Sequence, residues 1–304
     1  MLLHPEQTRR LIAHAVENHY AVLAVQADSP AAISDVLLAA EAGDAPVILE
    51  VTTSTLSGHG CGMGNPLLGV NRYLAEVEVL ANSDRFRNVP VACQVNGSDG
   101  ALLLKHAMQM GASSLRLDGS DLDAESHMDR VCDLCAIAIE YELSACLEIG
   151  VGRDEGLNAI EEARSVFGEL ETRFPDYLAL WAPRCGAGIT PDALGILHEM
   201  ACEFAGRSIG LVLPDASGLP EEAWTDAIEA GVAKVNWGVE LQRIRVHAAR
   251  AFFLEQTLPD LAVAARDHGW HAQVSRQVQP VLRDHLNRIG AAGQGQAFIQ
   301  SLYV

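Results

Sequence analysis

Short apolar runs alternate with longer segments of helical periodicity along most of the chain. The short runs are almost continuously apolar, which is typical of parallel strands that are buried on both faces. Eight of them are predicted to be strands: Ala21–Val25, Pro46–Val51, Pro90–Val95, Ser114–Leu117, Leu143–Ile149, Tyr177–Ala182, Ile209–Leu213 and Ala233–Trp237.

Segments of helical length and pattern lie between these runs. The clearest are Ala31–Ala42, Gly100–Met110, Asn158–Arg173, Asp192–Ala205 and Glu221–Ala230. Alternation of strand and helix predicts a closed parallel (β/α)8 barrel, the TIM-barrel fold. No linker or low-complexity stretch divides residues 1–304, so one barrel domain is expected, with extra helices over Thr257–Val304.

The net charge of the chain indicates which classes of binding partner are unfavourable. It has 40 acidic and 21 basic residues, for a formal net charge of −19. Such a chain repels phosphate backbones and anionic membranes, so neither nucleic acid nor a membrane is an expected partner. No long apolar span and no leader are evident, and an odd number of cysteines fits a reducing compartment, so a cytoplasmic location is expected.

The barrel prediction indicates where chemistry should lie, because active sites of such barrels sit at the C-terminal ends of the strands. Lys234 and Asn236 are two residues apart and therefore share the inward face of the last strand. Arg116 and Asp118 share one face of the fourth strand in the same way. Buried charges are normally paired, and Asp118 or Glu148 would be the partner of Arg116. These charges are either a structural ion-pair set or catalytic groups.

Several segments resemble those of the class II ketose-bisphosphate aldolases, and they occur in the same order. They are Val89–Ser98 (VPVACQVNGS), Ser114–Ser120 (SLRLDGS), Cys146–Gly150 (CLEIG), Leu211–Pro220 (LVLPDASGLP) and Gly231–Asn236 (GVAKVN). The resemblance covers almost the whole chain and implies a TIM barrel with aldehyde-lyase chemistry. It also implies a homodimer or homotetramer.

The chain departs from that family where the family binds metal. There, three histidines hold a zinc ion that polarises the ketose carbonyl, and the matching positions are Gly97, Cys185 and Pro214. Glycine and proline offer no side-chain ligand, so no metal or other cofactor is expected. Asn96 matches the aspartate that donates a proton to the aldehyde oxygen, and an amide cannot act as a general acid at neutral pH.

Other positions keep the family pattern. The resemblance places the residues matching Asp118 and Glu148 near the metal and the one matching Asn236 on the substrate. Part of the phosphate pocket also remains, whereas Val239 replaces a hydroxyl donor. The expected substrate-binding residues are Thr52, Gly186, Ser217, Gly218 and Asn236, and the expected catalytic residues are Lys234, Glu148, Asp118, Asn96 and Arg116.

Three functional hypotheses stay open. The first is a lyase that acts on a sugar phosphate or keto compound through an enolate without zinc. The enolate would be stabilised by a guanidinium such as Arg116 or Arg184, or by a Schiff base on Lys234. The second is a rearranged metal site that includes Cys185. The third is an inactive barrel that binds a metabolite or serves as a regulatory partner subunit.

Overall fold

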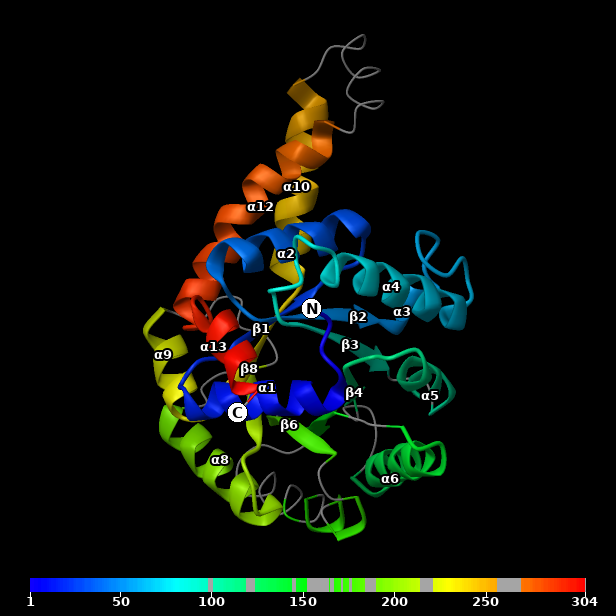
Figure 1. Cartoon of the computed structure of the whole chain (residues 1–304), viewed down its shortest axis with the longest axis vertical. Coiled ribbons are helices and arrows are strands. Elements are labelled where there is room, and N and C mark those ends of the chain that lie inside the picture. Colours follow the sequence, from blue (N-terminus) through cyan, green and yellow to red (C-terminus); the bar gives the residue numbers. More distant parts are fainter. Residues whose placement is uncertain are drawn as a thin grey trace.

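The computed structural model describes residues 1–97, 101–118, 124–143, 146–151, 164, 167–170, 172–174, 177–183, 190–213, 221–255 and 269–303. Eight parallel strands close into a barrel in the order of the sequence (Figure 1). They are β1 Val22–Gln26, β2 Val47–Thr52, β3 Val91–Gly97, β4 Ser114–Asp118, β5 Leu147–Val151, β6 Leu178–Pro183, β7 Gly210–Leu213 and β8 Val232–Trp237. The predicted (β/α)8 barrel is confirmed.

Helices surround the barrel where the sequence predicted them. The predicted ones are α2 Pro30–Gly43, α5 Ala101–Gln109, α6 Ala124–Glu140, α8 Pro191–Ala205 and α9 Glu221–Glu229. Ser29 and Thr190 begin α2 and α8, because each hydroxyl accepts a hydrogen bond from the backbone N–H three residues later, at 3.3 Å. The predicted Asn158–Arg173 helix lies mostly outside the described residues; positions 167–170 and 172–173 are helical.

One predicted strand begins later than expected. Leu143 belongs to the end of α6, because its N–H donates to the carbonyl of Ala138 at 2.7 Å and Glu142 adopts a left-handed conformation. The strand itself starts at Leu147. The apolar run that predicted a strand from Leu143 therefore includes the C-terminal cap of a helix.

Helix α1, Pro5–Glu17, covers the N-terminal end of the barrel and contacts β6, β7 and β8. Gly210, the first residue of β7, leaves room for this contact. A Cβ atom there would lie 2.8 Å from the Ile12 side chain and 2.7 Å from that of Ala233. Since this end is closed by α1, the opposite end of the strands is the one open to chemistry.

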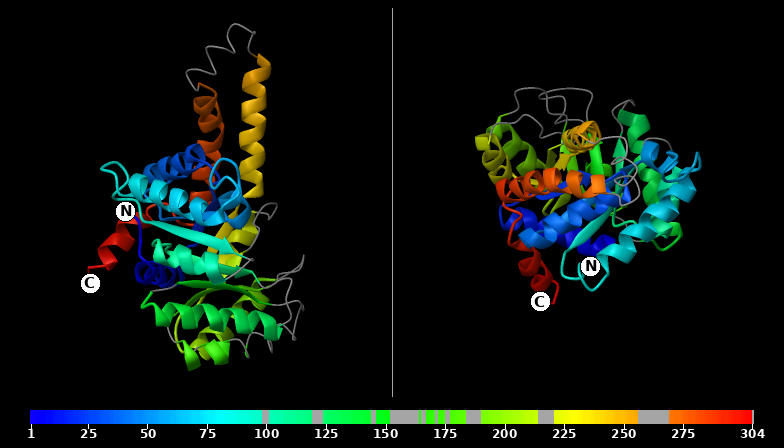
Figure 2. Two further views of the ribbon diagram at one scale, coloured as in Figure 1. Left: turned by 90° about the vertical axis from the view of Figure 1, so that its right-hand side faces the viewer. Right: turned by 90° about the horizontal axis from the view of Figure 1, so that it is seen from above.

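Two long helices form an arm that projects away from the barrel (Figures 1 and 2). They are α10, Val239–Glu255, and α12, Gly269–Arg288, which pack against each other; α12 also packs on α2. The extra C-terminal helices that the sequence predicted are α12 and α13, Gln294–Ser301. The short α3, Thr53–Ser57, and α4, Pro66–Ala81, follow β2.

His285 joins the arm to the barrel. Its ring lies between those of Trp237 at the end of β8 and Trp224 on α9, with centroids 4.3 and 5.5 Å away. Neither ring nitrogen of His285 has a hydrogen-bond partner within the described part of the chain. Burial lowers the pKa of His285, against the opposing effect of Glu240 and Asp284. The folded protein therefore holds His285 as the neutral imidazole.

We expect this histidine to make the protein less stable in acid. A base whose folded-state pKa is depressed contributes stability that is complete above its ordinary pKa of about 6.5 and is lost as the pH falls below that value. His285 should contribute up to about 1.4 kcal/mol per pH unit to the slope with which stability falls there. Urea unfolding from mildly acidic to neutral pH measures this slope, and His285→Phe, which keeps an aromatic ring, should reduce it to what other histidines with a lowered pKa, such as His14 and His198, contribute. An identical slope in both proteins would refute the assignment.

Candidate active site

The interior of the barrel holds a polar layer near its middle. Every second side chain of each strand points into the barrel. The strand register aligns Glu50 with Gln94, Gln94 with Ser114, and Arg116 with Glu148. Lys234 of β8 completes the layer. A barrel of this size has a filled core rather than a pore, so charges placed here must find partners within it.

Lys234 is the centre of this layer. Its Nζ donates to Glu50 Oε1 and to Glu148 Oε2, both at 2.5 Å, and its side chain is fully buried. Gln94 binds the same two carboxylates, because its Nε2 lies 2.9 Å from Glu50 Oε1 and 3.1 Å from Glu148 Oε2. Its carbonyl oxygen accepts from Ser114 Oγ at 3.0 Å. The two acids are therefore held together by one ammonium and one amide.

Arg116 supplies the second cation. Its Nε lies 3.4 Å from Glu148 Oε1, so Glu148 is its ion-pair partner among the described side chains. Burial raises the pKa of Glu148, but the charges of Lys234 and Arg116 and the hydrogen bonds from Lys234 and Gln94 outweigh it, and the net pKa lies below its ordinary value. With both acids ionised, the two acids and two bases sum to zero charge.

A second polar layer lies nearer the C-terminal ends of the strands. Asn236 of β8 is 6% exposed, and neither its amide nitrogen nor its amide oxygen has a hydrogen-bond partner within the described residues. Asn96 accepts from Gln94 Nε2 at 2.9 Å. The Thr52 hydroxyl accepts from the Thr55 backbone N–H at 3.3 Å and so caps α3. An unpartnered, buried amide costs free energy, which makes Asn236 a place where a ligand hydroxyl would be stabilised.

Some predicted site residues cannot be placed. Gly186, Ser217 and Gly218, expected to bind substrate, lie outside the described residues, as do Cys185 and Pro214. Asp118 is the last residue of β4, and its side chain is likewise outside the description. The structure thus brings together Lys234, Glu148 and Arg116, with Asn96 and Asn236 in the layer above.

Sequence analysis did not identify Glu50, Gln94 or Ser114 as members of the buried layer. Glu50 lies in an otherwise apolar run, VILEVT, and Gln94 lies in VACQVN. An acid in the centre of a strand that is buried on both faces was the available signal, because it requires a buried cation. Its partner could not be identified, since the contact depends on how eight strands close into a barrel.

Two of the three residues that match the family's zinc ligands, Gly97 and Pro214, have no side-chain donor for a metal ion. Gly97 ends β3 without a side chain, and a Cβ atom built there would lie 2.9 Å from the Leu104 side chain. No group of three or more His, Cys, Asp or Glu side chains in the described part is arranged to hold a metal. Since Pro214 also lacks a donor, at least two of the three family ligands are replaced by residues that cannot coordinate.

The glycine-rich segment after β2, Gly58–Gly64, forms a compact turn. The Gly58 carbonyl accepts from three backbone N–H groups, at 2.9 to 3.1 Å. A Cβ atom at Gly62 would lie 2.1 Å from the Leu56 carbonyl oxygen, so only glycine fits. The thiol of Cys61 donates to the Gly69 carbonyl at 3.4 Å, and burial raises its pKa, which disfavours a nucleophilic role.

Comparison with known proteins assigns the family. The family model described as fructose-bisphosphate aldolase class-II matches residues 6–294. The fructose-bisphosphate aldolase of Mycoplasma pneumoniae is 29% identical over 259 residues, which are 80% of this chain and 83% of that protein. The 6-phospho-5-dehydro-2-deoxy-D-gluconate aldolase of Shouchella clausii is 27% identical over 254 residues, 81% of this chain and 83% of that protein.

Solved structures agree in fold. The fructose-bisphosphate aldolase of Campylobacter jejuni superposes with a TM-score of 0.81 at 18% identity over 96% of each chain. The YdjI aldolase of Escherichia coli K12 gives 0.75 at 18% identity over 97% of this chain and 100% of that one. No helix within the described residues is long and apolar enough to cross a membrane. With the family model matched along nearly its entire length, the chain belongs to the class II fructose-bisphosphate aldolase family.

Proposed function

We propose that this protein is a lyase that breaks or forms a carbon–carbon bond of a sugar phosphate or related keto compound through an enolate, without the family's zinc ion. The observation that carries the proposal is Arg116, a cation inside the barrel on the strand beside Gly97, where zinc would be held in relatives. Family membership supports the lyase class. The retained acids and Asn236 support a substrate that bears hydroxyl groups.

For the proposed cleavage the protein must supply a base, a group that stabilises the enolate, and residues that bind the substrate hydroxyls. A base removes the proton of the substrate hydroxyl, the carbon–carbon bond breaks to release an aldehyde, and the electron pair of that bond forms an enolate. The protonated base then returns its proton to the enolate carbon. Arg116 stabilises the negative enolate oxygen electrostatically. Asn236 and Thr52 hold substrate hydroxyls, and Asn96 adds a hydrogen bond without acting as an acid. Asp118, at the end of β4, is the proposed base.

Lys234 is proposed to position the site rather than to form a Schiff base. Its amine is fully buried and is bound by two carboxylates, which favour the ammonium form over the neutral amine that a Schiff base requires. Lys234 holds Glu148 in place, and Glu148 in turn pairs with Arg116. The electrostatic route therefore has more structural support than the covalent one.

The decisive experiment is a panel of ketose phosphates and keto acids, assayed in both directions with and without a chelator and after borohydride treatment. We expect turnover that survives the chelator and leaves no adduct on Lys234. Loss of turnover in chelator would establish a rearranged metal site, and a trapped adduct would establish the Schiff-base route. Either result would refute the proposal as stated.

We expect no stoichiometric zinc in the purified protein after dialysis. The reason is that Gly97 and Pro214 stand where two imidazoles would be needed, and zinc sites of this kind use three protein ligands. Elemental analysis by mass spectrometry measures it. A metal content of about one zinc per chain would show that other residues form a site.

We also expect poor cleavage of fructose 1,6-bisphosphate. Both the zinc ligands and the aspartate acid of relatives are replaced, and each such loss typically lowers the rate by ~10² to 10⁴-fold. A coupled assay of triose phosphate release measures the turnover. A turnover number in the ordinary enzymatic range of ~1 to 10³ s⁻¹ would contradict this reading of the site.

A second function, a barrel that binds a metabolite or a partner without catalysis, is favoured by one observation. The Lys234 amine, both acids and the Gln94 amide satisfy one another inside the barrel, as purely structural groups would. Under this reading, sugar phosphates would raise the melting temperature, yet no member of the substrate panel would turn over.

A further inference from the structure

The hydrogen bonds beneath Asn96 determine which way its side-chain amide faces. The oxygen and the nitrogen of an amide side chain are distinguished by the groups around them. Gln94 Nε2 lies 2.9 Å from Glu50 Oε1 and 3.1 Å from Glu148 Oε2, and only the NH₂ end of an amide can donate to carboxylates. The carbonyl oxygen at the other end accepts from Ser114 Oγ at 3.0 Å. The orientation of the Gln94 amide is therefore fixed from both ends.

Gln94 in turn orients Asn96. The Gln94 nitrogen lies 2.9 Å from the side-chain oxygen of Asn96, and if the Asn96 amide were turned over, two donors would face each other. Asn96 therefore directs its oxygen toward the charged layer, and its NH₂ group faces away from that layer. Because Asn96 follows Gln94 by two residues on the inward face of β3, the NH₂ group faces the C-terminal mouth of the barrel. The amide thus offers a bound molecule a hydrogen-bond donor.

Arg116 brings a second donor to the same level of the barrel. The register of β3 and β4 aligns Asn96 with Arg116, so both side chains point into the barrel from neighbouring strands. The Arg116 side chain is 19% exposed, whereas that of its partner Glu148 is fully buried. The guanidinium therefore lies on the solvent side of the ion pair, which is the side that a substrate would approach.

We propose that the Asn96 amide and the Arg116 guanidinium form a two-donor oxyanion hole for the enolate oxygen, and that Gln94 is the positioning residue that turns the Asn96 amide toward it. The inference rests on the proposed function, to which it adds a second donor and the group that orients this donor. Donors that are held in place before the reaction stabilise developing charge without a cost of reorientation. The site should therefore favour ligands that present a negatively charged oxygen.

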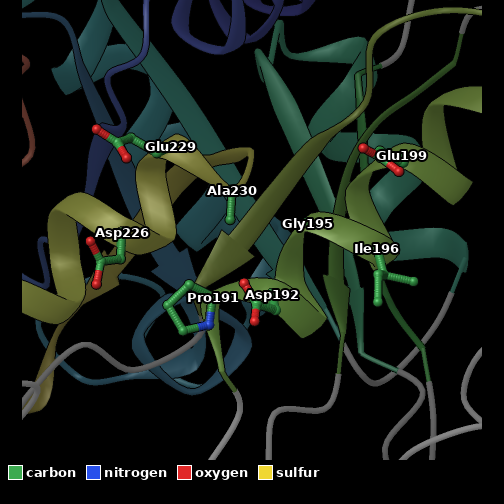
Figure 3. Close-up of a pocket in the computed structure, with 8 residues that line it drawn as sticks. All are labelled: Pro191, Asp192, Gly195, Ile196, Glu199, Asp226, Glu229 and Ala230. Carbon is green, nitrogen blue, oxygen red and sulfur yellow. The ribbon is translucent and has the colours of Figure 1, made fainter.

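The open groove between α8 and α9 offers no alternative site for such an anion. Its described lining contains Asp192 and Glu199 of α8, Asp226 and Glu229 of α9, and no basic residue, as Figure 3 shows. Like charges repel each other, so an anionic ligand is disfavoured there. In a chain with a net charge of −19, the mouth of the barrel differs from this groove because Arg116 supplies a cation.

Oxalate, a planar dianion that resembles the enolate of a keto acid, tests the oxyanion hole without requiring turnover. Isothermal titration calorimetry would compare the intact chain with Asn96→Ala and Asn96→Asp. We expect Asn96→Ala to raise the dissociation constant of oxalate by ~10 to 10²-fold, because a hydrogen bond to a charged group is lost. Asn96→Asp should raise it at least ~10-fold further, because a carboxylate then faces the anion. This gap should narrow as the pH falls, since protonation of the introduced carboxyl removes its charge and supplies a donor.

Gln94→Met tests the positioning role. It removes the group that orients Asn96, so it should weaken oxalate binding in the intact chain but not in Asn96→Ala, where no amide is left to orient. A general loss of structure would instead weaken binding in both backgrounds. Asn71→Asp is the matched control, because it makes the same chemical change at an exposed amide that bonds to His106 at 2.7 Å. It should leave the dissociation constant unchanged.

Three results would overturn the inference. They are an intact chain that does not bind oxalate, an Asn96→Asp variant that binds oxalate as tightly as Asn96→Ala at neutral pH, and additive effects of Gln94→Met and Asn96→Ala. Circular dichroism establishes that each variant is folded, and the order of the two Asn96 variants decides the matter even if Gln94→Met does not fold. Failure of the proposed function gives a different result, in which oxalate binds with the expected order of affinities but no member of the substrate panel turns over.

Discussion

Replacing Lys234 with methionine is expected to lower the free energy of unfolding by roughly 3–5 kcal/mol, the usual effect of removing one partner of a buried ion pair. Methionine fills a similar volume but leaves Glu50 and Glu148 facing each other in the barrel interior. Gln94 alone cannot offset two carboxylates, because its amide nitrogen already bonds to both and to Asn96.

Urea unfolding measures this loss, and its pH dependence identifies the cause. Without the ammonium, burial favours the protonated form of Glu148, so the difference between variant and intact protein should shrink as the pH falls. Lys105→Met is the matched control, since Lys105 is the other lysine of the chain and contacts the Tyr141 ring from a partly exposed position. It should cost about 1 kcal/mol or less. A similar small loss for Lys234→Met would show that the pair is not essential to the fold.

Replacing Arg116 with methionine is expected to lower kcat/KM of the activity found in the substrate panel by ~10² to 10³-fold, mainly through kcat. The reason is that the guanidinium is proposed to act on charge that develops only in the transition state. Arg116→Lys keeps the charge without the planar fork and should recover part of the rate. Steady-state kinetics with a saturable substrate separates kcat from KM.

A structural role alone predicts a different outcome for Arg116. Its loss would then lower the melting temperature while kcat of the folded fraction stayed the same. The variant should also raise the pKa of Glu148, because one of the cations that lower it is gone. Arg85→Met is a suitable control, since Arg85 pairs with Glu41 on the surface. An unchanged kcat in Arg116→Met would refute the hypothesis that Arg116 stabilises the enolate.

The strands were predictable because burial on both faces imposes nearly continuous apolar runs, which few other elements show. The same logic predicted that Lys234 shares the inward face of β8 with Asn236, and that Arg116 needs a buried acid. The sequence alone could not show that Arg116 meets Glu148, because this contact depends on the register of β4 and β5, which aligns the two residues. Glu50 was missed for the same reason, since its contact spans the barrel from β2 to β8.

Boundaries were less predictable where two elements share apolar residues. Leu143 continues the apolar pattern of β5 but hydrogen-bonds to the end of α6, so hydrophobicity alone assigned it to the wrong element. The loops at the C-terminal ends of β6 and β7 carry the positions that matched the family's phosphate pocket, and their assignment continues to rest on the sequence.

The balance of two acids and two bases inside the barrel limits how this lineage can change over time. Any single replacement of Glu50, Glu148, Lys234 or Arg116 by a neutral residue leaves one uncompensated charge in the interior. Substitutions at these positions should therefore occur in pairs, in which one acid and one base are lost or gained together. Among descendants and near relatives, a neutral residue at position 116 should accompany a neutral residue at position 50 or 148.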